Sequence, residues 1–241
     1  MKNSIKTFIA FLLFTMFFCS SAKSQLYIHL GYNAGFPTGL KNLNYVIDRY
    51  NQNRNYLTTN MKHINYLDGF TMSLGAAAEP MFFGFGYTYG VQRIFAEFKD
   101  KNGDMYKRDV KVSNVVFDMD FGIAAIDKSK GSIFFGGSMA IGSFTVKSRI
   151  DLKSEVDDQD WEKINLLESL VFTGGVFIKI VFSNPGIYIQ PYYQFTPGDI
   201  FKNDMTIVNE ALNNTMSIND PSPLNISNSS VGIKVGFSIS G

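Results

Sequence analysis

The sequence predicts an all-β protein: an eight-stranded antiparallel up-and-down transmembrane β-barrel with short helices in its long loops. Three observations predict this fold. Eight segments alternate oily and polar residues, which is typical of strands with two unlike faces. Long connections between these segments are separated by tight ones. Charged residues are almost absent from the segments and gather in the connections.

The first residues have the features of a secretory signal peptide. Two early lysines precede the apolar run FIAFLLFTMFF at 8–18, and small residues stand before a cleavage site near Gln25. The run is too short for a membrane-spanning helix. An alternative is a lipoprotein signal that lipidates Cys19. We therefore predict a signal peptide over 1–24 and one barrel domain over 25–241.

Composition excludes several classes of function. Cys19 is the only cysteine, so a chain that starts at Gln25 has no disulfide, no catalytic thiol and no cysteine metal site. Removal of 1–24 takes away three lysines and leaves 19 basic and 21 acidic residues, a net charge of −2. This balance lacks the basic footprint of a nucleic-acid-binding protein. No later apolar run reaches the ~18 residues of a membrane helix, so any membrane span must consist of strands.

In order along the chain, each strand is predicted by large apolar residues at every second position. The first four strands are 26–36 with Leu26, Ile28 and Leu30; 65–78 with Tyr66, Phe70 and Met72; 81–92 with Phe83, Phe85 and Tyr87; and 112–125 with Val115, Phe117 and Met119. The last four are 133–146 with Ile133, Phe135 and Met139; 170–182 with Phe172, Val176 and Ile178; 187–196 with Ile187, Ile189 and Tyr193; and 229–241 with Val231, Ile233 and Val235.

The connections have two lengths. Tight turns are predicted at 79–81, 127–131 and 183–186, and long loops at 37–64, 150–167 and 197–227. The third and fourth strands extend beyond the others to a hairpin turn at Asn102-Gly103. Apolar residues at helical spacing predict short helices that cap the barrel, at 40–50, 160–170 and 203–214.

The charges decide which strand face meets lipid. Within the strand limits the charged residues are Asp68, Asp118, Asp120, Lys179 and Lys234. A sheet surface in water would carry many charges of both signs, whereas small polar residues suit the narrow interior of an eight-stranded barrel. The large apolar face therefore points to hydrocarbon. Strands cross hydrocarbon only as a closed barrel, because an unpaired backbone group there costs several kcal/mol.

The cleavable signal, the eight alternating segments, the short and long connections and the final strand KVGFSISG together resemble small outer-membrane β-barrel proteins of Gram-negative bacteria, of the OmpA/OmpX-like and PorT-like kind. The resemblance implies an outer-membrane location, with tight turns in the periplasm and long loops outside. Members usually end in an aromatic residue that serves barrel assembly, but this chain ends in Gly241. For strands that stand above the membrane, the resemblance implies adhesion, and 93–112 is predicted to offer an edge to a partner strand.

Inward-facing polar residues are predicted to form a structural network that fills the lumen. They are His29, Glu79, Asp118, Asp120, Lys179, Gln190 and Lys234. Opposite charges there should pair, because a lone buried charge is costly. The alternative, a small ion path, conflicts with the narrow lumen of eight strands.

No catalytic, metal or cofactor site is predicted. The histidines His29 and His63 lie outside any G-x-S-x-G motif, and DKNGD at 100–104 lacks the bidentate glutamate of a calcium loop. The predicted function is that of a non-enzymatic structural or surface-interaction protein in contact with outer-membrane lipids, with a possible protein partner at the loops. Alternatives are an accessory subunit of a secretion or assembly machine, and a soluble periplasmic barrel that binds an apolar ligand.

Overall fold

The computed structural model describes residues 25–128, 130–152, 161–164, 170–196, 203–204, 206–213, 225–226 and 229–240. The predicted signal peptide, the C-terminal Gly241 and much of the loops 150–167 and 197–227 lie outside the described residues. Within the described ranges, no helix has the length and apolar character needed to cross a membrane.

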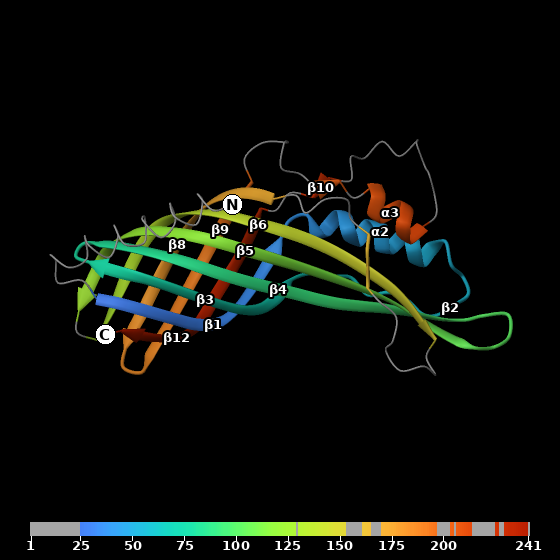
Figure 1. The fold of residues 1–241 in the computed structure, drawn as a ribbon, viewed down its shortest axis with the longest axis horizontal. Coiled ribbons are helices and arrows are strands. Elements are labelled where there is room, and N and C mark those ends of the chain that lie inside the picture. The colour runs from blue at the N-terminus through green and yellow to red at the C-terminus, as the bar shows by residue number, and fades with distance from the viewer. Residues whose placement is uncertain are drawn as a thin grey trace, which may run out of the picture.

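Eight long strands close into one barrel (Figure 1). They are β1 (Gln25–Pro37), β3 (Leu67–Ala78), β4 (Met81–Lys99), β5 (Met105–Lys128), β6 (Gly131–Leu152), β8 (Leu170–Ser183), β9 (Gly186–Phe195) and β12 (Ser230–Ser240). Each pairs antiparallel with the next of these strands along the chain. The last strand then pairs with the first, from Tyr27 opposite Ser240 to Pro37 opposite Ser230. The predicted eight-stranded up-and-down barrel is confirmed.

The outer face of the barrel is a belt of large apolar side chains. Exposed fractions reach 51% at Leu30, 60% at Phe117, 65% at Met139 and 69% at Phe237. The residues between them along each strand point inward and are small, polar or buried. Water would not tolerate so large a continuous apolar surface, whereas hydrocarbon does. The prediction that the large apolar side chains point outward and the small polar ones inward is confirmed.

Three strands continue past the barrel and form an arm, which we define as 92–99 of β4, 105–112 of β5 and 144–152 of β6 (Figure 1). Pairing of β4 with β3 ends at Val91, but its pairing with β5 runs on to Lys99 opposite Met105. The tip is the predicted hairpin turn, in which the Asp100 side chain accepts two backbone N–H bonds and Gly103 has φ of 88°. Glycine suits that left-handed backbone conformation.

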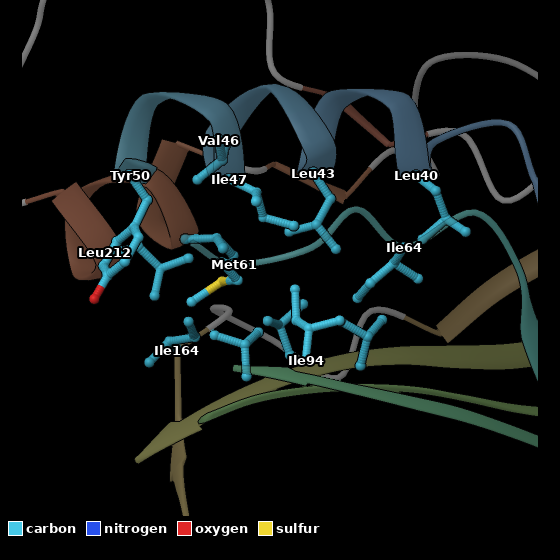
Figure 2. Close-up of a cluster of buried hydrophobic side chains, with 14 of the residues drawn as sticks. Leu40, Leu43, Val46, Ile47, Tyr50, Met61, Ile64, Ile94, Ile164 and Leu212 are labelled. Carbon is cyan, nitrogen blue, oxygen red and sulfur yellow. The ribbon is translucent and has the colours of Figure 1, made fainter. Parts of the chain in front are cut away.

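Two helices pack on one face of the arm, α2 (Leu40–Gln52) and α3 (Thr206–Asn213) (Figures 1 and 2). Their apolar stripes meet the arm in a second hydrophobic core outside the barrel. Its buried members are Leu40, Leu43, Val46, Ile47, Tyr50, Met61, Ile64, Leu67, Ile94, Ala96, Val110, Val112, Phe144, Val146, Ile164, Val208 and Leu212. We call the arm, both helices and the segment 57–66 the cap.

Some local predictions are wrong. A helix was expected over 160–170, but Glu162–Lys163 forms β7, which pairs with β6 at Lys147 and Ser148. The edge predicted over 93–112 is covered on the β5 side by β6, up to Leu152 opposite Tyr106, and in part on the β4 side by β2 (Leu57–Thr59). Covered edges resist unwanted strand addition. Two further short strands, β10 (Asn203–Asp204) and β11 (Asn225–Ile226), pair with each other.

Candidate functional site

The lower lumen, near the tight turns, is filled by stacked rings. The imidazole of His29 lies between the rings of Tyr27 and Tyr188, with centroids 4.4 Å away on each side. Tyr27 also stacks on Phe82 at 5.1 Å and donates a hydrogen bond to the carbonyl of Phe83. Tyr27, Phe82, Phe134 and Phe177 form a small buried cluster at this level. The histidine is therefore held by packing.

Two acids and two lysines share the lumen with these rings. Lys234 Nζ contacts Asp118 Oδ2 at 2.8 Å, and the Gln190 amide donates to Asp120 at 2.9 Å. Lys179 Nζ lies 3.4 Å from His29 Nδ1 and 4.2 Å from the centroid of the Phe82 ring. Two negative and two positive groups thus balance in a space removed from bulk water, where an unpaired charge would be costly.

The lumen is plugged at the level of Asn33 and Lys234. Asn33, Asp118, Tyr192 and Lys234 surround a cavity of about 20 Å³, which is room for about one water molecule. Tyr192 donates to the Asn33 side chain at 3.0 Å across it. A space of this size, closed by an ion pair and hydrogen bonds, is not an open aqueous channel.

The structure brings together six of the seven polar residues predicted to face the lumen. His29, Asp118, Asp120, Lys179, Gln190 and Lys234 are all buried there. The assignment of Glu79 is wrong, because this residue is exposed in the tight turn between β3 and β4. The alternation that predicts facing ends where the strand ends, at Ala78, and does not extend into the turn.

A second charged cluster lies on the outer face of the arm, opposite the helices. Asp109 is fully buried and accepts two bonds from Arg93, at 3.1 Å and 2.5 Å. Lys107 and Arg149 approach the same carboxylate at 3.4 Å and 3.5 Å, and Arg149 also contacts Asp151 at 2.9 Å. Burial raises the pKa of Asp109, but the bonds and positive charge of Arg93 and Lys107 outweigh it, so the net pKa is lowered.

Trp161, the only tryptophan, joins β7 to this cluster. The guanidinium carbons of Arg93 and Arg149 lie 5.1 Å and 4.7 Å from its ring centroid. Such cation–π contacts are worth about 0.5–1 kcal/mol each at exposed sites. Trp161 is therefore a spectroscopic reporter placed on the cap.

The far side of α2 faces a groove of about 740 Å³. Leu40, Tyr45, Asp48, His63 and Ile64 are among its lining residues. His63 Nε2 lies 2.7 Å from Asp48 Oδ1 in an exposed pair. The Asn44 side chain donates one bond to the Ile64 carbonyl and accepts another from the Ile64 N–H, and this pair of bonds holds the segment beneath the helix. The groove is open, and its lining combines apolar residues such as Leu40 and Ile64 with polar side chains.

No group of three or more possible metal ligands occurs within the described part of the chain. His29 is sandwiched between rings, and its Nδ1 lies 3.3 Å from the Ser73 hydroxyl and 3.4 Å from Lys179 Nζ, whereas His63 pairs with an exposed acid.

The closed ladder and the apolar exterior together decide the architecture. It is that of a closed eight-stranded antiparallel β-barrel with an apolar outer belt. No protein-family model and no curated protein matches the sequence. Two solved structures are similar to this chain at 10% sequence identity, and both are Ail, the attachment invasion locus protein of Yersinia pestis.

The structure of Ail in complex with the heparin analogue sucrose octasulfate aligns over 90% of this chain and 99% of that chain, with a TM-score of 0.42. Another Ail structure aligns over 90% of this chain and 97% of that chain, with a TM-score of 0.33. The architecture of the present chain is established by its own strand pairing and not by these two alignments.

Sequence reasoning missed the cluster around Asp109 and the extent of the cap core. The signal for the first was present, since Arg93, Lys107, Asp109, Arg149 and Asp151 share the parity of the lipid-facing residues on their strands. No sequence signal joins α3 to α2, because their contact depends on how the barrel places two loops that are far apart in the chain.

Proposed function

We propose that the chain is an integral outer-membrane protein of a Gram-negative bacterium, without enzymatic activity, that presents its cap outside the cell to a macromolecular partner. One observation carries the proposal: the cap has a hydrophobic core of its own, beyond the barrel. A barrel needs no such core to cross a bilayer. Helices packed on a three-stranded arm instead give a rigid surface at a fixed distance from the membrane.

The plugged lumen supports this role over transport. Its polar residues pair with one another, and the Asn33–Lys234 level leaves space for about one water molecule. We assign the lumen network a structural role, because each group contacts a neighbour on another strand and thereby holds the barrel section. The parts that protrude from the barrel then carry the function.

The solvent-facing side of α2 and its groove are the best candidates for the contact surface. Tyr45 is 43% exposed, and the guanidinium carbon of Arg49 lies 5.9 Å from its ring centroid. Tyrosine and arginine are enriched at energetic centres of protein interfaces. The partner is either a surface outside the cell or a subunit of a secretion or assembly machine in the same membrane.

Labelling on intact cells tests the location and orientation. In a Cys19→Ser background, Lys41→Cys lies on α2 and Glu79→Cys lies in a tight turn, and both positions are exposed. A membrane-impermeant maleimide should label position 41 on intact cells, and position 79 only after the outer membrane is opened. Equal labelling of both positions on intact cells would refute the orientation, and recovery of the protein in the soluble fraction would refute the membrane location.

Cross-linking then separates the two kinds of partner. A discrete adduct of fixed stoichiometry within isolated outer membranes would favour the machine subunit. Attachment of intact cells to an external surface, lost in a Leu43→Ala/Ile47→Ala variant that still forms a folded barrel, would favour surface interaction. If that variant keeps both the adduct and the attachment, the cap is not the surface that contacts the partner.

A further inference from the structure

We propose that the outer face of the arm binds phosphorylated lipid headgroups of the surrounding leaflet, through a row formed by Lys111 and Lys147 with Arg93 at its end. This inference rests on the proposed membrane location. It adds a ligand class, the phosphate ester of a lipid, and a binding surface that is separate from the groove beside α2.

Strand register places the three cations side by side. Arg93 lies opposite Lys111 on β5, and Lys111 lies opposite Lys147 on β6. Directly opposite residues on one face have Cβ atoms about 5 Å apart, and like charges in that position destabilise the sheet. Arg93 already has Asp109 as its partner, so the unbalanced like charges of the row are those of Lys111 and Lys147, which favour a negative partner.

The row lies on the same face of the sheet that points to lipid within the barrel part of these strands. Odd-numbered residues of β4, β5 and β6 point outward, as shown by exposed Phe117, Phe121, Met139 and Ile141. Lys111 is one outward position above the level of Val91 and Ser113, where the closed barrel ends, at about 7 Å of strand per position. That distance corresponds to the headgroup layer, which adds about 5–7 Å on each side of the hydrocarbon.

The nearest carboxylate is already occupied. Asp109 accepts Arg93, Lys107 and Arg149, so its charge is more than balanced. Within the described residues, no carboxylate lies within 4.0 Å of Lys111 or Lys147. Both lysines are half-buried, so their stems lie along the sheet while the ammonium groups can reach a phosphate beside it.

Two other kinds of anion are alternative partners of the row. Free inorganic phosphate offers the same chemistry without the acyl chains. The connection 153–160 carries Glu155, Asp157, Asp158 and Asp160 in its sequence, and these carboxylates would neutralise the row if they served as its partner. The experiment has one arm for each.

The test uses the full-length protein refolded into phosphatidylcholine vesicles that contain a minor fraction of phosphatidic acid. Native mass spectrometry of the released protein measures retained phosphatidic acid relative to phosphatidylcholine. The wild-type protein should retain phosphatidic acid preferentially. Because each lysine near an anionic surface contributes about fivefold, Lys111→Gln/Lys147→Gln should lower this preference about 25-fold.

The matched control is Lys99→Gln/Lys101→Gln, which removes two exposed lysines at the arm tip and should leave the preference unchanged. Millimolar inorganic phosphate should not displace the lipid; displacement would assign the row to free phosphate and overturn the lipid proposal. Equal retention by the wild type and Lys111→Gln/Lys147→Gln would also overturn it.

Neutralising the four carboxylates of 153–160 decides the remaining alternative. Unchanged retention supports the lipid as the partner of the row. The opposite result is a wild type with no preference for phosphatidic acid and a preference that appears only once the four carboxylates are neutralised. That result would mean that the chain's own acids occupy the row, and it would overturn the lipid proposal. If the wild type fails to enter vesicles at all, the membrane location fails; if it enters but retains no phosphatidic acid, only the present inference fails.

Discussion

The barrel lumen and the cap core are two interiors built on opposite principles. The lumen contains stacked aromatic rings and four charged groups, whereas the cap core is almost entirely aliphatic. The outside of the cap is water, so moving apolar side chains into its core gains the full hydrophobic effect. The outside of the barrel is hydrocarbon, so an apolar lumen would gain far less, and polar pairing and ring stacking specify it instead.

This difference predicts that the two regions fail separately. Damage to a lumen charge pair should destabilise the barrel, while damage to the cap core should loosen the helices above an intact barrel. Trp161 reports the cap by fluorescence, and the change in gel mobility between boiled and unboiled samples reports the barrel.

The largest effect is expected for Lys234→Met in the lumen. It leaves Asp118 as an uncompensated buried charge, and breaking a buried pair costs about 3–5 kcal/mol. Urea unfolding in vesicles, followed by gel mobility, measures the loss. The double variant Lys234→Met/Asp118→Leu should recover most of it, and a double variant as unstable as the single one would show that the pair is not the cause.

A comparable but separate effect is expected for Leu43→Ala in the cap. Leu43 is fully buried on the inner face of α2, and removal of a buried leucine side chain costs about 2–5 kcal/mol. The cap should become sensitive to protease and shift the Trp161 emission, while the barrel keeps its unboiled gel mobility. Tyr45→Ala, at an exposed position of the same helix, is the control. Joint loss of cap and barrel would contradict two separate interiors.

A charge on the lipid face should cost about 2–4 kcal/mol near the bilayer midplane. Val235→Arg places it there, on the outward face of β12. Phe95→Arg, outward on the arm but above the belt, should cost only about 1 kcal/mol through its lost contact with Lys107. Unfolding in vesicles compares the two, and similar losses would mean that the belt does not meet hydrocarbon.

The smallest effect is an acid sensitivity confined to the cap. The folded pKa of Asp109 lies below the unfolded value of about 3.9. Its contribution to stability is therefore full above that value and is lost as pH falls through the lower folded pKa. Trp161 emission against pH should show this step, and Asp109→Asn should abolish it. An identical acid transition in the variant would assign the sensitivity to another group.

The sequence predicts the barrel well because a period of two is a local signal. The alternation in SSVGIKVGFSIS, or the contrast of Phe117 with Asp118, records the difference between lipid and lumen residue by residue. The 3.6-residue spacing from Leu40 to Tyr50 predicts α2 for the same reason.

Features that depend on long-range contact are not accessible in this way. β7 has two residues, and its strand form depends on pairing with β6, so the apolar spacing of its sequence suggested a helix instead. The alternation of inward and outward residues ends with β3 at Ala78, so it does not predict the direction of Glu79 in the turn. The row at Lys111 and Lys147 emerges only after the register between strands is known.

A single-cysteine scan along β12 tests the central claim most directly. With Cys19 replaced by serine, spin labels at positions 231 to 239 are measured in bilayers for contact with lipid-soluble oxygen and with a water-soluble nickel complex. The account predicts strong oxygen contact at Val231, Ile233, Val235, Phe237 and Ile239 and little at the positions between them. Water contact at the odd positions, or no alternation along the strand, would contradict a lipid-facing belt around an enclosed polar lumen.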